Sequence, residues 1–184
     1  MEEAEKSYIK VITIKSDHAY SYNNLAATQK ELGLSRDETC AVGASYGGYA
    51  ALTLAYKHGD IFECVAGGMG VYDMKILRDG SDESIYTYQD DYFEIAEDFW
   101  GSDEKQHIDF SPVFNADKMK SRILMWHGLQ DPISPIMHLD LMKEALEENN
   151  VEYKSFTMSR LGHTFGREED MRAHFPVIKD FLFE

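Results

Sequence analysis

The sequence predicts an α/β fold with a mostly parallel sheet and helices on both faces, because strand-like and helix-like runs alternate along it. Strands that alternate with helices form right-handed βαβ units, and such units build a parallel sheet. A glycine-rich turn between a predicted strand and a predicted helix is typical of the same fold class. Five short runs have the composition of buried parallel strands, at residues 8–15, 38–43, 61–67, 122–127 and 152–158.

Four stretches between and after these strands are predicted to be helices, at residues 23–32, 46–59, 135–149 and 173–183. The first ends at Gly33, a residue that suits the carboxyl end of a helix. The last has Pro176 near its start, where proline is tolerated. The third carries an apolar stripe at helical spacing, formed by Ile136, Leu139, Met142 and Leu146.

The length and composition favour one acidic domain over residues 1–184. A net charge of −15 argues against nucleic acid and anionic membranes as partners, since both would repel it. The amino end lacks the pattern of a signal peptide, and no apolar run approaches 18 residues, so we expect a cytoplasmic protein. Cys40 and Cys64 are expected to act as small buried hydrophobic residues.

The turn at residues 43–50 reads GASYGGYA and places Ser45 in a G-x-S-x-G nucleophile elbow. Gly43 and Gly47 supply the lack of bulk that such a turn needs, and Gly48 helps the backbone to turn. The serine hydroxyl then lies at a helix N-terminus. There the backbone N–H of Tyr46 is the first candidate to bind a developing oxyanion.

Two later loops supply the other members of a catalytic triad. Asp131 follows the predicted strand at 122–127, and His163 follows the predicted strand at 152–158. The order serine, aspartate, histidine is that of α/β-hydrolases and differs from the chymotrypsin and subtilisin orders. Because this fold usually needs about 200 residues or more, the chain is expected to be a reduced version of it.

The chain resembles the catalytic domain of the prolyl oligopeptidase family of serine hydrolases over about residues 22–184. The segments that carry the resemblance are GASYGGYAAL, FECVAGGMGVYDM, DFSPVFNADKMKSRILMWHGLQDPISP and LGHTF. The resemblance implies Ser45 as nucleophile, Asp131 as acid and His163 as base. It also implies a tyrosine hydroxyl as second oxyanion donor, for which Tyr20 and Tyr22 are the candidates.

Residues 71–118 break the alternation of strands and helices. They form an insertion that is predicted either to be a lid or substrate pocket above the strand ends, or to be helices with an aromatic packing face. The pocket candidates are Tyr72, Tyr86, Tyr88 and Trp100.

The predicted function is a serine peptidase that cleaves short peptides through an acyl-enzyme. This chemistry needs no cofactor, and no zinc-type spacing of cysteine and histidine occurs. Two alternatives stay open: a carboxylesterase on small acyl esters, and an inactive truncated hydrolase. The edge of the strand at 8–15 is expected to pair with a second copy of the chain or with a complementing partner, unless the loop at 16–22 and the acidic amino end cover it and leave a monomer. His127 is expected to be structural.

Overall fold

The computed structural model describes residues 39–79, 103–164 and 168–184, and the residues from Cys40 onward form one compact unit. This unit contains a parallel sheet with the strand order β1-β2-β3-β4. The strands are β1 (Cys40–Ala44), β2 (Cys64–Gly68), β3 (Arg122–Gly128) and β4 (Tyr153–Met158). The predicted parallel sheet is confirmed for these four strands. The strand predicted at 8–15 and the helix predicted at 23–32 lie outside the described residues.

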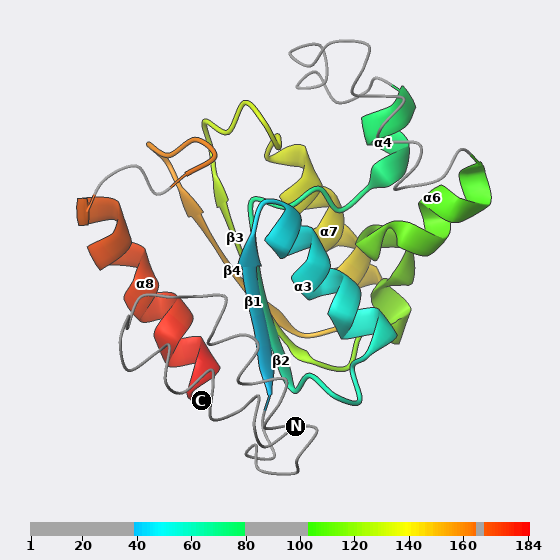
Figure 1. Ribbon diagram of the computed structural model, residues 1–184, viewed down its shortest axis with the longest axis horizontal. Helices are drawn as coiled ribbons and strands as arrows, with labels where there is room; N and C mark the ends of the chain where they lie inside the picture. Colours follow the sequence, from blue (N-terminus) through cyan, green and yellow to red (C-terminus); the bar gives the residue numbers. More distant parts are fainter. Residues whose placement is uncertain (1–38, 80–102, 165–167) are drawn as a thin grey trace, which may run out of the picture. The chain divides into compact units, whose positions relative to one another are not determined.

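Helices cover both faces of the sheet, as predicted. Helices α3 and α7 lie on one face and α8 lies on the other (Figure 1). The helical elements are α3 (Tyr46–Lys57), α4 (Met74–Asp79), α6 (Glu104–Phe110), the 3-10 helix η2 (Pro112–Lys118), α7 (Met137–Glu148) and α8 (Glu168–Leu182). Within the described residues, no helix is long and apolar enough to cross a membrane.

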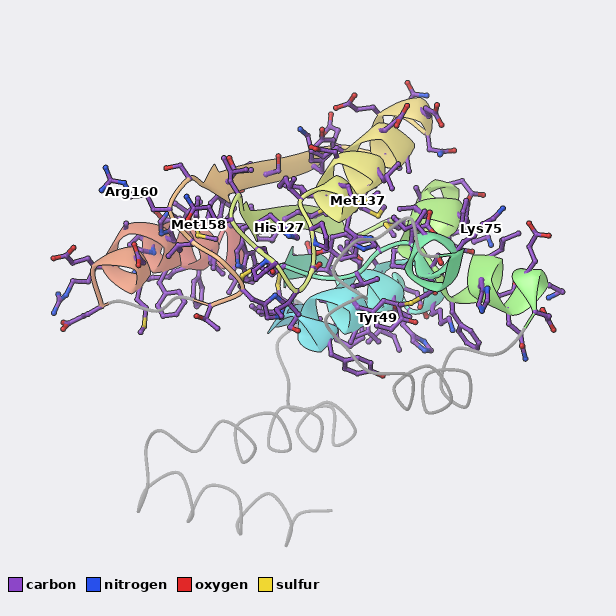
Figure 2. The ribbon with its side chains drawn as sticks, turned by 90° about the horizontal axis from the view of Figure 1, so that it is seen from above. Tyr49, Lys75, His127, Met137, Met158 and Arg160 are labelled. Atoms are coloured by element: carbon purple, nitrogen blue, oxygen red, sulfur yellow. A yellow bond between two sulfur atoms is a disulfide. The ribbon has the colours of Figure 1, made fainter. Side chains whose placement is uncertain are left out.

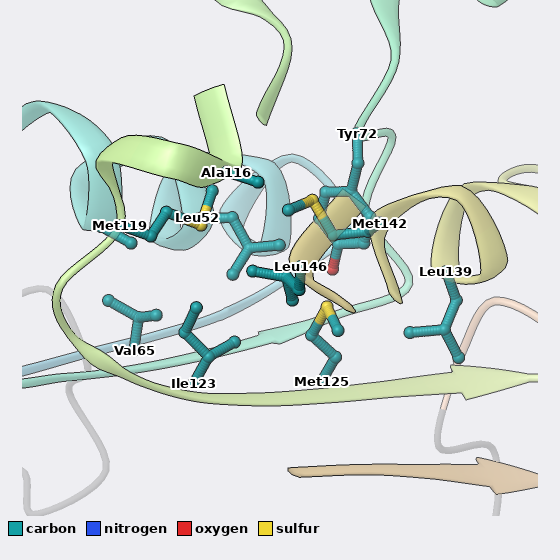
Figure 3. Close-up of a cluster of buried hydrophobic side chains, with 11 residues drawn as sticks. Leu52, Val65, Tyr72, Ala116, Met119, Ile123, Met125, Leu139, Met142 and Leu146 are labelled. Carbon is teal, nitrogen blue, oxygen red and sulfur yellow. The ribbon is translucent and has the colours of Figure 1, made fainter. Parts of the chain in front are cut away.

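Two hydrophobic clusters hold the layers together, because successive strand residues point to opposite faces of the sheet. The cluster under α3 and α7 contains Leu52, Val65, Ile123, Met125, Leu139, Met142 and Leu146 (Figure 3). The cluster under α8 contains Cys64, Ala66, Leu124, Trp126, Ile178 and Phe181. Both faces of the sheet are therefore packed against helices, which fixes the carboxyl ends of the strands from which the loops emerge.

Of the two helices after β3, α7 agrees with its prediction from the sequence and α8 differs from it at its amino end. In α7, the predicted stripe is confirmed, since Leu139, Met142 and Leu146 are buried and Ile136 packs against them. Helix α8 begins at Glu168, five residues before the predicted start at 173, so Pro176 lies in its interior. Three acidic residues in its first turn favour this earlier start, because they interact well with the helix dipole.

The cysteines pack in the cluster under α8, as expected, but the expectation that they act only as small hydrophobic residues was wrong. Cys40 and Cys64 face each other in the register of β1 and β2, with their Cα atoms 4.6 Å apart, and they form a disulfide. Sequence spacing could not reveal this pair, because the residues are 24 positions apart and only the strand register brings them together.

The described ends of the 71–118 insertion form helices that pack onto the rest of the fold. The 3-10 helix η2 contacts both α3 and α7. Ser111 joins the two ends, because its Oγ accepts a hydrogen bond from the Met74 N–H (2.8 Å) and donates one to the His107 carbonyl (2.6 Å). Residues 80–102 lie outside the described residues, so a lid over the strand ends stays a prediction.

Candidate active site

Ser45 lies in a sharp turn between β1 and α3. Its backbone angles are φ 58° and ψ −124°, a conformation that a residue with a side chain rarely adopts. The Ser45 N–H donates to the Gly68 carbonyl at the end of β2 (2.8 Å), and the N–H groups of Gly48 and Tyr49 donate to the Ser45 carbonyl (2.9 and 3.1 Å). These bonds hold the turn in its strained form, as expected for a nucleophile elbow.

The crowding in this turn agrees with the prediction at Gly43 but not at Gly47. A Cβ atom on Gly43 would lie 2.3 Å from the Gly47 carbonyl oxygen, and one on Gly48 would lie 2.4 Å from the Gly68 carbonyl oxygen. A Cβ atom on Gly47 would meet no described atom within 4 Å. Close approach therefore requires glycine at 43 and 48, whereas the prediction that Gly47 must lack bulk is not supported.

A continuous chain of hydrogen bonds joins the three residues that the sequence predicted as a triad. His163 Nε2 lies 2.7 Å from Ser45 Oγ, and His163 Nδ1 lies 2.8 and 3.1 Å from the two carboxylate oxygens of Asp131. A carboxylate only accepts hydrogen bonds, so the ring hydrogen lies on Nδ1. Nε2 is then free to accept the hydrogen of the Ser45 hydroxyl.

The Asp131 carboxylate is buried and held by its own loop. Its side chain is 0% exposed, whereas that of His163 is 20% exposed. Asp131 Oδ1 accepts hydrogen bonds from the backbone N–H groups of Ile133 and Ser134, both at 2.9 Å. These bonds compensate for the loss of water around the carboxylate and leave Oδ2 directed to His163.

The aspartate loop and the histidine loop are joined by their backbones. The N–H of Leu129 donates to the Met158 carbonyl and the N–H of Gln130 donates to the Leu161 carbonyl, both at 3.0 Å. Gly128 permits this approach, because a Cβ atom there would lie 2.3 Å from the Gly162 carbonyl oxygen. These backbone contacts hold the aspartate loop and the histidine loop next to each other.

Among the oxyanion candidates, only Tyr46 lies in the described part of the chain. Its N–H belongs to the first residue of α3, where helical N–H groups point outward from the N-terminus, and its side chain is 68% exposed. Tyr20 and Tyr22 lie outside the described residues.

Of the four pocket candidates, Tyr72 alone lies in the described part of the chain. Tyr72 is fully buried in the cluster under α3 and α7, where Figure 3 shows it, so its ring has no surface for a substrate. Its role corresponds to the alternative of aromatic packing, and burial raises the pKa of its hydroxyl. Tyr86, Tyr88 and Trp100 lie outside the described residues.

A cavity of about 820 Å³ lies at the amino ends of the strands, whereas the candidate triad lies at their carboxyl ends. It is lined by residues at the amino ends of β3 and β4, among them Arg122 and Tyr153, and by Phe181 and Glu184 at the end of α8. No three His, Cys, Asp or Glu side chains of the described residues are grouped to hold a metal ion.

Sequence reasoning missed Ser134, which is 1% exposed and binds the Asp131 carboxylate through its N–H. A signal was present: aspartate side chains often accept hydrogen bonds from the N–H groups two and three residues later. The spacing from Asp131 to Ser134 fits that turn.

A parallel sheet with a strained serine after one strand and an aspartate and a histidine after two others defines the class of α/β-hydrolases. Residues 23–184 match the sequence profile of the prolyl oligopeptidase family. The chain belongs to that family.

Known proteins of the family resemble this chain over most of its length. Dipeptidyl aminopeptidase BIII of Pseudoxanthomonas mexicana is 27% identical over 153 residues, which is 80% of this chain and 22% of that protein. The fold is similar to a Mycobacterium tuberculosis puromycin-hydrolyzing peptidase, with a TM-score of 0.73 and 19% identity over 87% of this chain and 24% of that one. It is also similar to Pyrococcus horikoshii acylaminoacyl peptidase, with a TM-score of 0.70 and 18% identity over 89% and 27%.

The chain thus spans about a quarter of the length of these relatives. Two of them are similar at the level of fold alone, since their identities are below 20%.

Proposed function

We propose that this chain is a serine peptidase that cleaves short peptides through an acyl-enzyme, with Ser45, His163 and Asp131 as its catalytic residues. The observation that supports the proposal most strongly is the hydrogen-bonded chain from Ser45 Oγ through the His163 ring to the Asp131 carboxylate. The strained turn at Ser45 supports it further, because such strain is found where a nucleophile must project from a strand end.

In the proposed reaction, Ser45 Oγ attacks the carbonyl carbon of the substrate while His163 Nε2 takes the hydroxyl proton. The carbonyl oxygen becomes an oxyanion, and the Tyr46 N–H donates a hydrogen bond to it. Asp131 holds the ring by its Nδ1–H and stabilises the positive charge that the ring acquires.

His163 then donates the proton to the leaving amine, the bond from carbon to nitrogen breaks, and an acyl group remains on Ser45. A water molecule attacks this ester, with His163 again as base, and releases the acid and free Ser45.

The peptide substrate is proposed from the relatives. The names of three of them describe a dipeptidyl aminopeptidase, an acylaminoacyl peptidase and a puromycin-hydrolyzing peptidase. All three names describe peptidases, and a peptidase cleaves an amide bond. We therefore propose a short peptide or an aminoacyl amide as the substrate, without a preference for one side chain.

Labelling by a fluorophosphonate probe tests whether Ser45 is activated. We expect the purified chain to be labelled at Ser45, and Ser45→Ala to abolish labelling and hydrolysis, a loss on the order of 10⁴ to 10⁶ in rate. Ser159→Ala is the matched control, because this exposed serine lies on the histidine loop but outside the hydrogen-bonded chain. Labelling that persists in Ser45→Ala would show that another serine reacts.

An amide and an ester that carry the same acyl group distinguish peptidase activity from the two alternative functions. Hydrolysis of an aminoacyl nitroanilide supports a peptidase. Turnover of the matching nitrophenyl ester alone supports a carboxylesterase, since an ester has the better leaving group. A folded chain that is neither labelled nor active on either substrate is an inactive hydrolase.

A further inference from the structure

His127 is a buried histidine that the proposed reaction does not use. It lies in β3 four residues before Asp131, is 0% exposed, and is labelled in Figure 2. Its Nε2 lies 2.6 Å from the Ser134 carbonyl oxygen. A carbonyl oxygen only accepts, so the ring hydrogen lies on Nε2. Nδ1 has no hydrogen-bond partner among the described residues.

The protonation state of His127 follows from these surroundings. Burial lowers the pKa of the ring, and the hydrogen bond to Ser134 and the charge of Asp131 oppose that effect only in part. A second proton on Nδ1 would be buried without a partner, which is costly. The ring is therefore the neutral tautomer with its hydrogen on Nε2, a fixed hydrogen-bond donor.

Ser134 receives this hydrogen bond and transmits its position to Asp131. Its carbonyl accepts from His127 (2.6 Å), its N–H donates to Asp131 Oδ1 (2.9 Å), and its hydroxyl donates to the Gly70 carbonyl (3.0 Å). Ser134 is thus tied to β3, to the loop after β2 and to the carboxylate. Its place determines where Asp131 Oδ1 is held.

We propose that His127 is a positioning residue, which acts through Ser134 to direct the Asp131 carboxylate at His163. The inference rests on the proposed function, because Asp131 matters only if it orients the base. His127 Nε2 is 3.6 Å from Asp131 Oδ2, too far for a hydrogen bond, so the contact through Ser134 is the one that positions the carboxylate.

Two substitutions at His127 separate hydrogen bonding from packing. His127→Leu keeps a buried apolar side chain but removes the donor, and His127→Gln keeps an N–H donor that never titrates. We expect His127→Leu to lower the rate of fluorophosphonate labelling on the order of tenfold, the effect of losing one buried hydrogen bond. We expect His127→Gln to recover most of that rate. If His127→Leu does not unfold cooperatively, His127→Asn replaces it, because its amide is too short to reach Ser134.

A double-mutant cycle with Asp131→Asn shows whether His127 acts through Asp131. If it does, His127→Leu costs about tenfold in the native background and little in the Asp131→Asn background, because the group that it positions is already gone. An equal loss in both backgrounds would overturn the proposal, since it would mean that His127 only supports the fold.

A measurement without turnover keeps this proposal separate from the proposed function. The hydrogen on His163 Nδ1, bonded to a carboxylate, is expected to give a far-downfield proton resonance. This resonance should be present in the native chain and in His127→Gln, and weakened or shifted in His127→Leu. An unchanged resonance in His127→Leu contradicts the positioning role. If the resonance changes only in His127→Leu, as expected, but the probe does not label the native chain, the proposed function is contradicted and the positioning role of His127 is not.

Discussion

Ser45 shows how a single residue depends on the backbone of its neighbours. Its positive φ angle is maintained by a hydrogen bond that its N–H donates to β2, by hydrogen bonds that its carbonyl accepts from α3, and by glycines that let two backbones touch. The residue types around the turn were readable from the sequence. The sequence did not show which of these glycines is crowded, because that depends on how closely α3 passes β1 and β2.

Gly43→Ala and Gly47→Ala form a matched pair that tests this crowding. Gly43→Ala forces a Cβ atom to 2.3 Å from the Gly47 carbonyl oxygen, and we expect it to destabilise the fold by about 1–3 kcal/mol and to reduce labelling of Ser45 strongly. Gly47→Ala meets no described atom and lies in α3, where alanine is favoured over glycine by about 1 kcal/mol. Chemical unfolding and probe labelling of both variants provide the comparison. Equal destabilisation by the two changes would contradict the structure.

His127 also makes the stability of the fold depend on pH. Burial holds the pKa of its ring below the ordinary value of 6.5, and the charged or titratable groups that act on it are Asp131, His138 and His163. Below about pH 6.5 the unfolded chain binds a proton at His127 that the folded chain does not bind. The free energy of unfolding therefore falls as the pH falls through that range.

Unfolding by urea at pH 7.5, 6.5 and 5.5 measures this dependence. We expect the native chain to lose stability toward pH 5.5, and His127→Gln to lose less, because glutamine does not titrate. The other titratable groups are the same in both proteins, so the difference between the two slopes reports His127 together with its interactions with Asp131, His138 and His163. Equal slopes would mean that the folded state binds this proton as readily as the unfolded one.

At the scale of elements, the helices and strands of the described residues follow local patterns, and their exceptions have tertiary causes. The strands after position 60 were predicted within a few residues from the composition of short apolar runs. Helix α7 was predicted equally well from its apolar stripe at helical spacing. Helix α8 extends further toward its amino end than predicted. Its first turn is acidic and exposed, so apolar spacing carries no signal there.

The disulfide between β1 and β2 is expected to stabilise the strand that presents Ser45. It closes a loop of 24 residues that contains α3, and a loop of this size gives about 3 kcal/mol in chain-entropy terms. We expect a reducing agent to lower the unfolding temperature of the native chain. The double variant Cys40→Ala with Cys64→Ala should be less stable and should not respond to the reducing agent. Two free thiols in the unreduced native chain would contradict the disulfide.

At the scale of the whole molecule, the described sheet ends at β1 on one side and at β4 on the other. Val42 in β1 is 50% exposed, although a valine in a parallel strand is usually buried. Side chains project from the faces of a sheet, so this exposure does not mark an unpaired strand edge. Self-association through the edge of the strand predicted at 8–15, which lies outside the described residues, stays a prediction.

Sedimentation at several protein concentrations tests that expectation. We expect the native chain to form larger species as its concentration rises. Val11→Lys, in the strand predicted at 8–15, should reduce this association, because a charge on an edge strand opposes strand pairing. Val177→Lys, on an exposed face of α8, is the matched control for added charge. A native chain that sediments as a monomer throughout, and that unfolds cooperatively, would show that the chain is self-sufficient.

The sequence by itself determined the fold class, the order of the described strands along the chain and the three residues of the candidate triad. These depend on local signals: apolar periodicity, glycine at a strand-to-helix turn, and acid and base residues directly after strands. The tertiary structure decided the pairing of Cys40 with Cys64, the burial of Tyr72 and the link from His127 through Ser134 to Asp131. The first two depend on strand register and on the packing of elements far apart in the sequence, which no local pattern specifies. In the third, the spacing from Asp131 to Ser134 carries a local signal, but the approach of the Ser134 carbonyl to His127 depends on how the loop closes over the end of β3.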